Sequence, residues 1–222
     1  MSRRTSILLM MITLLAAIPA AAATTCENLA NLALPHARID SAQMVAAGAF
    51  VQPSGRGGAV NPFAKLPAFC RVTATLAPTS DSDIKTEIWL PASGWNGKFQ
   101  AVGNGGWAGT IPYPALAAAL AAGYAGAGTD TGHVGNSADF ALGHPEKLTD
   151  LAYRSIHEMT VQSKTIINAH YGTPRSSLIT TAARRAADRG SRQRSNTLKT
   201  SMGSLPAPPP GIRCALTAPA WR

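Results

Sequence analysis

Residues 98–129 read KFQAVGNGGWAGTIPYPALAAALAAGYAGAGT, and this stretch decides the fold class. Lys98 to Val102 is a short β-rich segment that predicts a strand and leads into a glycine-rich loop. Pro114 to Ala122 predicts an alanine-rich helix, with a proline near its first turn and Gly123 just past its end. The small residues from Tyr124 to Thr129 predict a buried strand. Strand, helix and strand in succession indicate an α/β fold, a sheet with helices on its faces.

The segments on either side extend this pattern. Thr86–Pro91 alternates and predicts a strand, and the Asn-Gly turn at 95–97 predicts a hairpin with the strand at 98–102. A single helix is expected from about Glu146 to His170, closed by Gly172 and Pro174. Its buried face is predicted from residues at helical spacing, namely Ala152, Ile156, Met159, Ser163, Ile166 and Ile167.

The first 23 residues have the pattern of a secretory signal peptide. Arg3 and Arg4 are followed by an apolar run at 7–15 and by the small residues Ala21-Ala22-Ala23, so the mature chain is expected to start near Thr24. The apolar run is too short for a good membrane anchor. We therefore expect a secreted or periplasmic protein with no membrane attachment once the signal is cleaved.

Charge divides the chain into a neutral body and a basic tail. Residues 24–174 hold nine Lys and Arg against ten Asp and Glu, whereas residues 175–222 hold nine against Asp188 alone. The tail shows neither helical nor strand periodicity, and it ends in proline-rich sequence. We therefore expect residues 24–174 to be the folded part and residues 175–222 to be a non-native, disordered tail. The net charge of +9 is not read as a nucleic-acid-binding surface, and no nucleic-acid partner is expected.

The cysteines fit an exported protein. In an oxidising compartment Cys26 and Cys70 are expected to form a disulfide. Cys214 is left alone in the tail.

The loop after the strand at 98–102 carries the clearest chemical signal. Gly103-Asn104-Gly105-Gly106 lies between a strand and a helix, where backbone amides can approach a ligand closely. In α/β-hydrolases a glycine-rich loop in this place supplies half of the oxyanion hole. Gly105 and Gly106 are therefore oxyanion-loop candidates. A merely tight strand-to-helix turn is the equally weighted alternative.

Several segments together resemble the tannase and feruloyl esterase family of secreted serine esterases. The matching segments are Leu66–Val72, Glu87–Pro91, Trp95–Phe99, Gly103–Gly106, Thr129–His133, Gly143–Glu146 with Asp150, Tyr153 and Arg154 with His157, Lys164, and Tyr171-Gly172. The resemblance implies the N-terminal part of an α/β-hydrolase fold, a small phenolic ester as substrate and no cofactor. In the family a segment like Ser-Tyr-(Tyr/Phe)-(Asn/Asp)-Gly-Cys-Ser-Thr-Gly-Gly-Arg-Gln-Gly comes next and holds the nucleophilic serine. No such segment occurs in this chain, so the resemblance is expected to stop before the nucleophile elbow.

The tail explains this gap when its codons are considered. Thr180 to Gly190 can be encoded so that reading one base earlier gives Asn-Gly-Cys-Ser-Thr-Gly-Gly-Arg-Gln-Gly, with the serine codon straddling Ala183 and Arg184. We infer a one-base frame change near residues 175–177. The helix at 146–170 and the strand at 124–129 are then expected to lose part of their covering, because the strand due at 175–180 would be missing.

Other polar residues receive two interpretations each. Asp130 and His133 follow a strand end and could line a site. An Asx-type turn with a structural histidine is the favoured alternative. The five histidines match no metal-binding spacing, and no metal is expected. Ser137, Ser155 and Ser163 lack the Gly-x-Ser-x-Gly setting of a nucleophile, so no catalytic residue is assigned.

Three functions follow from these observations. The first is a carboxylic-ester hydrolase for phenolic esters that is inactive in the 222 residues given, because the Ser, His and Asp of the family are not among them. The second is a secreted non-catalytic module, and the third is a binding protein that uses the basic tail. The tail lacks aromatic residues between Arg175 and Ala220, which disfavours the third.

Overall fold

The computed structural model describes residues 23–53, 61–172 and the backbone of 179–183. A six-stranded sheet has the order β1-β2-β3-β5-β4-β6. The strands are β1 (Ala37–Val45), β2 (Phe69–Leu76), β3 (Ile84–Pro91), β4 (Lys98–Val102), β5 (Ala125–Thr129) and β6 (Ile179–Ala183). The principal helices are α1 (Tyr113–Ala121), α2 (Pro145–Thr149) and α3 (Ser155–Tyr171). Short 3-10 helices lie at Glu27–Asn31 and Asp139–Ala141.

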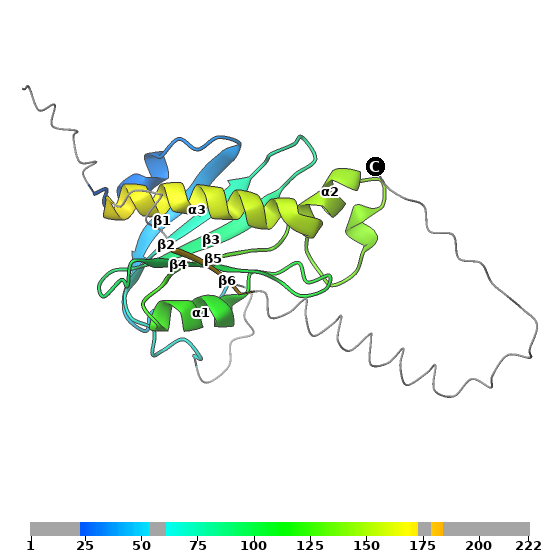
Figure 1. Ribbon diagram of the computed structural model, residues 1–222. Coiled ribbons are helices and arrows are strands. Elements are labelled where there is room, and N and C mark those ends of the chain that lie inside the picture. Colours follow the sequence, from blue (N-terminus) through cyan, green and yellow to red (C-terminus); the bar gives the residue numbers. More distant parts are fainter. Residues whose placement is uncertain (1–22, 54–60, 173–178, 184–222) are drawn as a thin grey trace, which may run out of the picture.

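The sheet is mixed and is covered on both faces. Neighbours from β1 through β2 and β3 to β5 are antiparallel, whereas β5, β4 and β6 are parallel to one another. Figure 1 shows α3 on one face of the sheet and α1 on the other. The expected α/β class is therefore confirmed. The expected signal sequence, Cys214 and most of the basic tail lie outside the described residues.

The expected hairpin between β3 and β4 is wrong, because β5 lies between them. β5 pairs antiparallel with β3 and parallel with β4, and all five of its residues are buried. The Asn96 turn is held instead to the end of α1: its backbone N–H donates to the Gly123 carbonyl, and its side-chain Nδ2 donates to the Ala122 carbonyl. An Asn-Gly pair predicts a turn, but it does not say which strand lies alongside.

The helix expected from about residue 146 to 170 contains a wider turn. A π-helical segment, Asp150–Arg154, separates α2 from α3. It inserts an extra residue into the helical repeat, so Asp150 points inward while Ala152 is exposed, contrary to the expected face. From Met159 onward the predicted face is correct, and Gly172 ends the helix in the left-handed conformation.

Alternation along the strands gives the two faces of the sheet different cores. Cys70, Val72, Ala74 and Leu76 of β2 pack with α3 in a mainly aliphatic cluster. The opposite face of the sheet packs with α1 in an aromatic cluster that includes Phe50, Phe63, Phe69, Trp89 and Tyr113. Neither β1 nor β2 was predicted from the sequence, although the alternation in 69–76 is a clear strand signal.

β6 occupies a position that was expected to be empty. It lies parallel to β4, with Lys98 opposite Ile179 and Val102 opposite Ala183. Ile179, Thr180 and Thr181 are β-branched, and the otherwise unpaired edge of β4 offers them a hydrogen-bonding partner. The expectation that α3 and β5 would lose their covering is not met: Met159, Ile166, Ile167 and all of β5 are buried.

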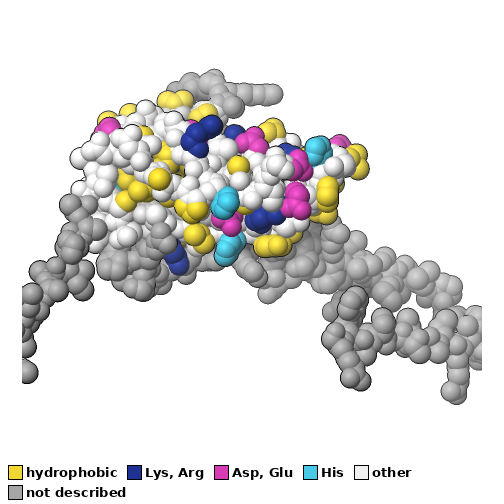
Figure 2. Space-filling model, turned by 90° about the horizontal axis from the view of Figure 1, so that it is seen from above, with side chains coloured by type: hydrophobic (Ala, Val, Ile, Leu, Met, Phe, Trp, Pro, Cys, Tyr) yellow, Lys and Arg dark blue, Asp and Glu magenta, His cyan; other side chains and the backbone are white. Residues whose placement is uncertain are grey.

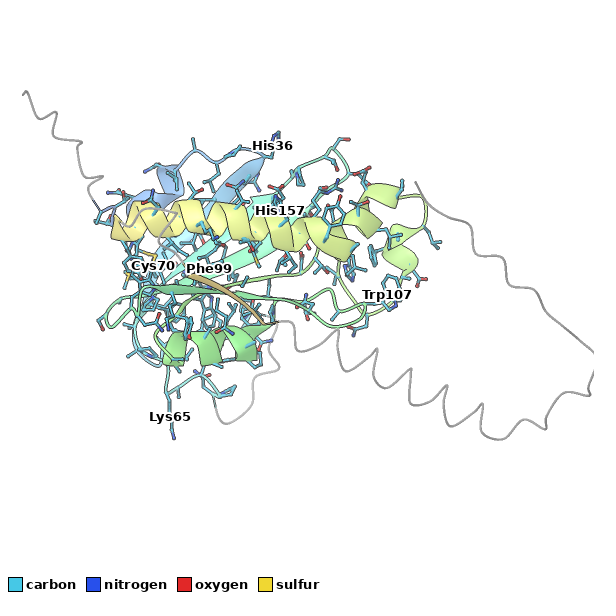
Figure 3. All side chains as sticks on the ribbon, in the orientation of Figure 1. His36, Lys65, Cys70, Phe99, Trp107 and His157 are labelled. Atoms are coloured by element: carbon cyan, nitrogen blue, oxygen red, sulfur yellow. A yellow bond between two sulfur atoms is a disulfide. The ribbon has the colours of Figure 1, made fainter. Side chains whose placement is uncertain are left out.

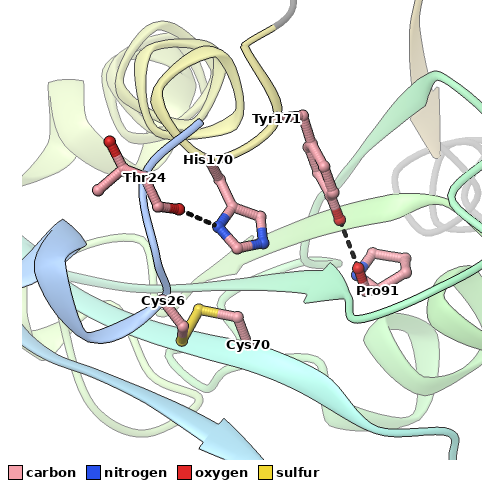
Figure 4. Close-up of a disulfide and its surroundings, with 6 residues drawn as sticks. All are labelled: Thr24, Cys26, Cys70, Pro91, His170 and Tyr171. Atoms are coloured by element: carbon pink, nitrogen blue, oxygen red, sulfur yellow. Dashed lines mark hydrogen bonds between the residues drawn. A yellow bond between two sulfur atoms is a disulfide. The ribbon is translucent and has the colours of Figure 1, made fainter. Parts of the chain in front are cut away.

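The N-terminal segment is fastened to the end of α3 and to β2. The predicted disulfide between Cys26 and Cys70 is present and links the segment to β2 (Figure 4). The Tyr171 hydroxyl donates to the Pro91 carbonyl, and its ring stacks on Trp95 with 4.0 Å between ring centroids. The disulfide thus joins the N-terminal segment to β2, and the Tyr171 contacts join the end of α3 to the end of β3 and to the turn that follows it.

On the outer surface over α3, charged side chains of both signs are intermingled toward the α2 end (Figure 2). No helix in the described part of the chain is both long and apolar enough to cross a bilayer.

Candidate functional site

The candidate site lies at the carboxyl ends of the parallel strands β4 and β5. β4 leads through α1 to β5 on one side, and β5 leads through α3 to β6 on the other side of β4. The chain therefore reverses its direction of winding at β4, the kind of position where open α/β sheets bind ligands. The glycine loop follows β4 at this point, and Trp107 on that loop lies at the far end of the molecule from Cys70 (Figure 3).

Asn104 holds the glycine loop against β5. Its side-chain Nδ2 lies 3.0 Å from the Ala108 carbonyl oxygen, 3.0 Å from that of Thr110 and 2.8 Å from that of Thr129. These contacts close the loop on itself and join it to the last residue of β5. From the sequence, Asn104 is only a part of the glycine motif. An amide side chain among glycines, where few other side chains can fix the backbone, was the available signal.

Gly105 and Gly106 lie at the tip of this loop. Gly106 is exposed and has a φ of 59°, and the Gly105 carbonyl accepts a hydrogen bond from the Ala108 N–H. Within the described part of the chain, the N–H groups of Gly105 and Gly106 have no hydrogen-bond acceptor. Two neighbouring amides are thus available to an anionic oxygen at this edge of the sheet.

Gly109 allows the loop to cross the backbone of the following turn. A β-carbon at this position would lie 2.4 Å from the His133 carbonyl oxygen and 2.6 Å from its ring. The Gly109 N–H donates to the Gly135 carbonyl at 2.7 Å. The glycine loop and the turn after β5 are therefore packed backbone against backbone.

His133 is a buried part of that contact. Its Nε2–H donates to the Trp107 carbonyl at 2.9 Å, and its Nδ1 lies 3.2 Å from the Thr131 hydroxyl. The ring stacks on Phe140, with 3.8 Å between centroids. Both ring nitrogens are engaged within the protein, so His133 as placed positions the glycine loop and is not a free base.

Asp130 forms the Asx-type turn considered in the sequence analysis. One carboxylate oxygen, Oδ1, accepts from the Gly132 N–H and from the Lys85 N–H, both at 2.9 Å. Burial raises the pKa of Asp130 to about 6, although these two hydrogen bonds oppose the shift. Thr131 has a φ of 62°, which is strained for a β-branched residue. The turn after β5 is thus tightly held.

A pocket of about 500 Å³ opens beside this turn. Its wall includes Asp130, His133 and Phe140, together with charged side chains from the start of β3 and from α2. Lys85 donates to Asp83 and His144 contacts Asp81, so much of this charge is paired at the rim. The structure therefore brings Asp130 and His133 to one pocket and places Gly105 and Gly106 on the neighbouring loop.

Asp150 is a carboxylate whose burial was not predicted from the sequence. It is fully buried and accepts from the Arg154 Nε, while its Oδ2 has no hydrogen-bond partner among the described residues. A β-carbon on Gly132 would lie 3.6 Å from that oxygen, so Asp150 sits directly behind the Asp130 turn. Arg154 also donates to Glu146, which ties the π-helical turn together.

The three serines without a nucleophile motif lie away from the pocket lining. Ser155 and Ser163 are fully buried, and the Ser137 hydroxyl donates to Asp139. In the regions that the structure describes, no three His, Cys, Asp or Glu side chains are grouped so that they could hold a metal ion.

Several known proteins are similar to this chain in sequence and in fold. Residues 70–180, half of the chain, match the family model described as tannase and feruloyl esterase. An uncharacterized esterase of Xanthomonas campestris pv. campestris is 41% identical over 153 residues, which is 68% of this chain and 26% of that protein. A probable feruloyl esterase B-1 of Aspergillus oryzae is 34% identical over 151 residues, covering 66% of this chain and 28% of the relative.

Two crystal structures from Aspergillus oryzae are similar in fold. An esterase superimposes with a TM-score of 0.61 at 28% identity, covering 71% of this chain and 32% of that one. Feruloyl esterase B gives a TM-score of 0.59 at 30% identity, covering 71% and 31%. This chain thus spans about a quarter of the length of the curated relatives it matches.

Proposed function

Because this chain belongs to the tannase and feruloyl esterase family, we propose that it carries the oxyanion-loop side of a carboxylic-ester hydrolase acting on phenolic esters such as feruloyl or galloyl esters. The observation that carries the proposal is the glycine loop after β4, whose Gly105 and Gly106 amides have no acceptor among the described residues, at the winding reversal of the sheet. A tetrahedral intermediate of acyl transfer places negative charge on one oxygen, and backbone N–H groups stabilise it without reorganising.

The parts of the site have separate roles in this proposal. Gly105 and Gly106 donate to the oxyanion. Asn104 and His133 are positioning residues, because they fix the loop through backbone carbonyls and do not present a free reactive atom. Asp130 and His133 line one side of the substrate pocket. The protein acts outside the cytoplasm, after export by its signal sequence, in keeping with its disulfide.

We further propose that the 222 residues given do not hydrolyse esters. A serine nucleophile needs a base within hydrogen-bond reach. The family's nucleophile segment is not present in this sequence, and we infer that it is encoded one base out of frame, because Thr180 to Gly190 can be written with codons that give it. β6, Ile179–Ala183, follows the inferred frame change, and its five residues include no serine and no histidine. Residues 24–174 then form the N-terminal part of the esterase domain, and 175–222 form a non-native tail.

The test is to restore the reading frame in the gene and to compare the two products. With a one-base change in the codons of residues 175–177, the exported protein is expected to hydrolyse methyl ferulate or methyl gallate, and the chain as given is expected to have no activity. The control replaces the restored serine by alanine. A restored, folded and inactive product would overturn the esterase proposal, and activity in the chain as given would overturn the proposed inactivity.

The loop itself is tested in the frame-restored protein. Gly106→Ala is expected to lower kcat by about 10-fold or more, because a side chain at positive φ shifts the donor amide. Gly97→Ala is the matched control, with a φ of 76°, open space around its Cβ and a position in the turn before β4. Equal activity of the two variants would favour the alternative that the loop is only a tight turn.

A further inference from the structure

The first described residues make contacts that acquire a new meaning once the signal sequence is removed. The Thr24 backbone N–H donates to the Ala169 carbonyl at 2.8 Å. The His170 Nδ1–H donates to the Thr24 carbonyl at 3.0 Å (Figure 4). Ala169 and His170 belong to the last turn of α3, so Thr24 is bound at the C-terminal end of that helix.

The end of α3 offers a site for a positive charge. The last four carbonyl groups of a helix lack partners within the helix, and the helix macrodipole places partial negative charge there. One of these carbonyls, that of Asn168, accepts from the Gly172 N–H, and that of Ala169 accepts from Thr24. In the uncleaved chain Thr24 contributes only a neutral amide to this end.

The sequence pattern and the structure both point to the peptide bond between Ala23 and Thr24. Ala21-Ala22-Ala23 is a small-residue cleavage pattern, and Ala23 is exposed while Cys26 is buried in its disulfide. We propose that a signal peptidase hydrolyses the Ala23–Thr24 bond and that the new α-ammonium group of Thr24 caps the C-terminal end of α3. Hydrolysis consumes one water, leaves a carboxylate on Ala23 and leaves a protonated amine on Thr24.

Processing therefore stabilises the folded domain as well as releasing it. The ammonium group keeps the hydrogen bond to Ala169 and adds a full positive charge at the negative end of the helix. The disulfide at Cys26 holds the segment two residues away, which limits the entropy lost on docking. This site depends on export and not on ester chemistry, so it stands or falls separately from the proposed function.

The test compares three versions of the chain that start at Thr24, at Ala23 and at Ala22. Only the first places its ammonium group on α3, whereas the second carries it on an exposed residue. The Thr24 version is expected to unfold about 1–4 °C above the other two, which should agree with each other. The mass of the exported protein is expected to correspond to a start at Thr24.

Two further measurements keep the proposal falsifiable. The Thr24 amine is expected to react about 2- to 5-fold more slowly with an amine-selective reagent at pH 7 in the folded chain than in urea, because its charged form is stabilised. If the 24–222 chain aggregates, the three starts are compared in the frame-restored protein. A start at another residue, equal unfolding midpoints for all three starts, or unchanged amine reactivity would overturn the proposal.

Discussion

The two faces of the sheet are built from the same strands but are held together in different ways. On the α3 face β2 and β3 contribute aliphatic residues, and the Cys26–Cys70 disulfide closes the cluster. On the α1 face the alternate residues of the same strands include a buried carboxylate, Glu87, and its partner Arg71. The α3 face is stabilised by a disulfide, and the α1 face is stabilised by the hydrogen bonds and the ion pair of the Glu87 carboxylate.

The Glu87 cluster shows why a buried charge is tolerated there. Glu87 accepts from Arg71 with both carboxylate oxygens, from the Trp89 Nε1–H at 3.0 Å and from the Tyr113 hydroxyl at 2.9 Å. The guanidinium of Arg71 also lies over the Phe50 ring. The hydrogen bond to Glu87 raises the pKa of Arg71, and burial raises that of Tyr113. The hydrogen-bonding groups of this cluster satisfy one another, so removing Glu87 leaves the donors of Arg71, Trp89 and Tyr113 without their acceptor.

The largest effect is expected on this aromatic face. Glu87→Gln should lower the free energy of unfolding by about 3–5 kcal/mol, because Arg71, only 16% exposed, is left without a counter-charge. Urea unfolding of the chain measures this. The double variant Arg71→Met with Glu87→Gln should lose less than the single variant, since no buried charge is left. A double variant as unstable as the sum of the two single variants would show that the ion pair is not the cause.

The α3 face should respond next, through its disulfide. Replacing Cys26 and Cys70 together by serine opens a loop with a sequence separation of 44 residues. In the chain-entropy model the loss is about 4 kcal/mol. The same urea experiment, with and without a reductant, measures it, and the serine variant should be insensitive to reductant. A reductant-sensitive serine variant would point to Cys214 instead.

The free energy of unfolding should depend on pH through Asp130, which lies in the turn after β5. Burial raises the pKa of Asp130 to about 6 in the folded state, from 3.8 for a carboxyl exposed to water. The folded protein therefore binds more protons than the unfolded chain between about pH 4 and pH 6, and stability falls as pH rises through that window. The loss is at most about 3 kcal/mol at 1.36 kcal/mol per pKa unit.

Asp130→Asn is the variant that isolates this term. The side-chain oxygen can still accept from Gly132 and Lys85, but it no longer titrates. The difference in stability between the variant and the parent should therefore shift in favour of the variant from pH 4 to pH 7. A difference that does not change with pH would assign the dependence to another group.

The smallest effect is expected where α1 approaches β5. A β-carbon on Gly128 would lie 2.9 Å from Cδ of Pro112, whereas one on Gly126 would lie 3.4 Å from its nearest neighbours. Gly128→Ala should therefore cost about 1–3 kcal/mol, and Gly126→Ala should cost less. Thermal unfolding of both variants gives the comparison. Equal costs would show that α1 can move to accommodate either methyl group.

Features that depend on a few neighbouring residues were predicted correctly from the sequence. The glycine loop, the helix ends at Gly123 and Gly172, the buried strand at 125–129 and the pairing of two cysteines were all predicted. Each depends on turn geometry, side-chain size or redox chemistry within a few residues. The family resemblance covered residues 26–174, because many short matches in a fixed order are specific, and the family model matches residues 70–180.

Three features depended on segments far apart in the chain. The sequence placed β3 beside β4, but β5 separates them, because a central position suits a strand of small, fully buried residues. It made Ala152 a core residue, but the π-helical turn buries Asp150 instead. It left residues 179–183 without a strand, but the open edge of β4 pairs with them.

For this protein the amino-acid order was enough to specify the α/β class, the disulfide and the glycine loop, because each is encoded in neighbouring residues or in the compartment the signal implies. Only the tertiary structure decided the strand order, the role of His133 in holding Trp107, and the contact of Thr24 with α3. The physical reason is that hydrogen-bond partners and buried neighbours are chosen among segments separated by tens of residues. Sequence periodicity reports which side of a segment is apolar, and it carries no information about which segment covers that side.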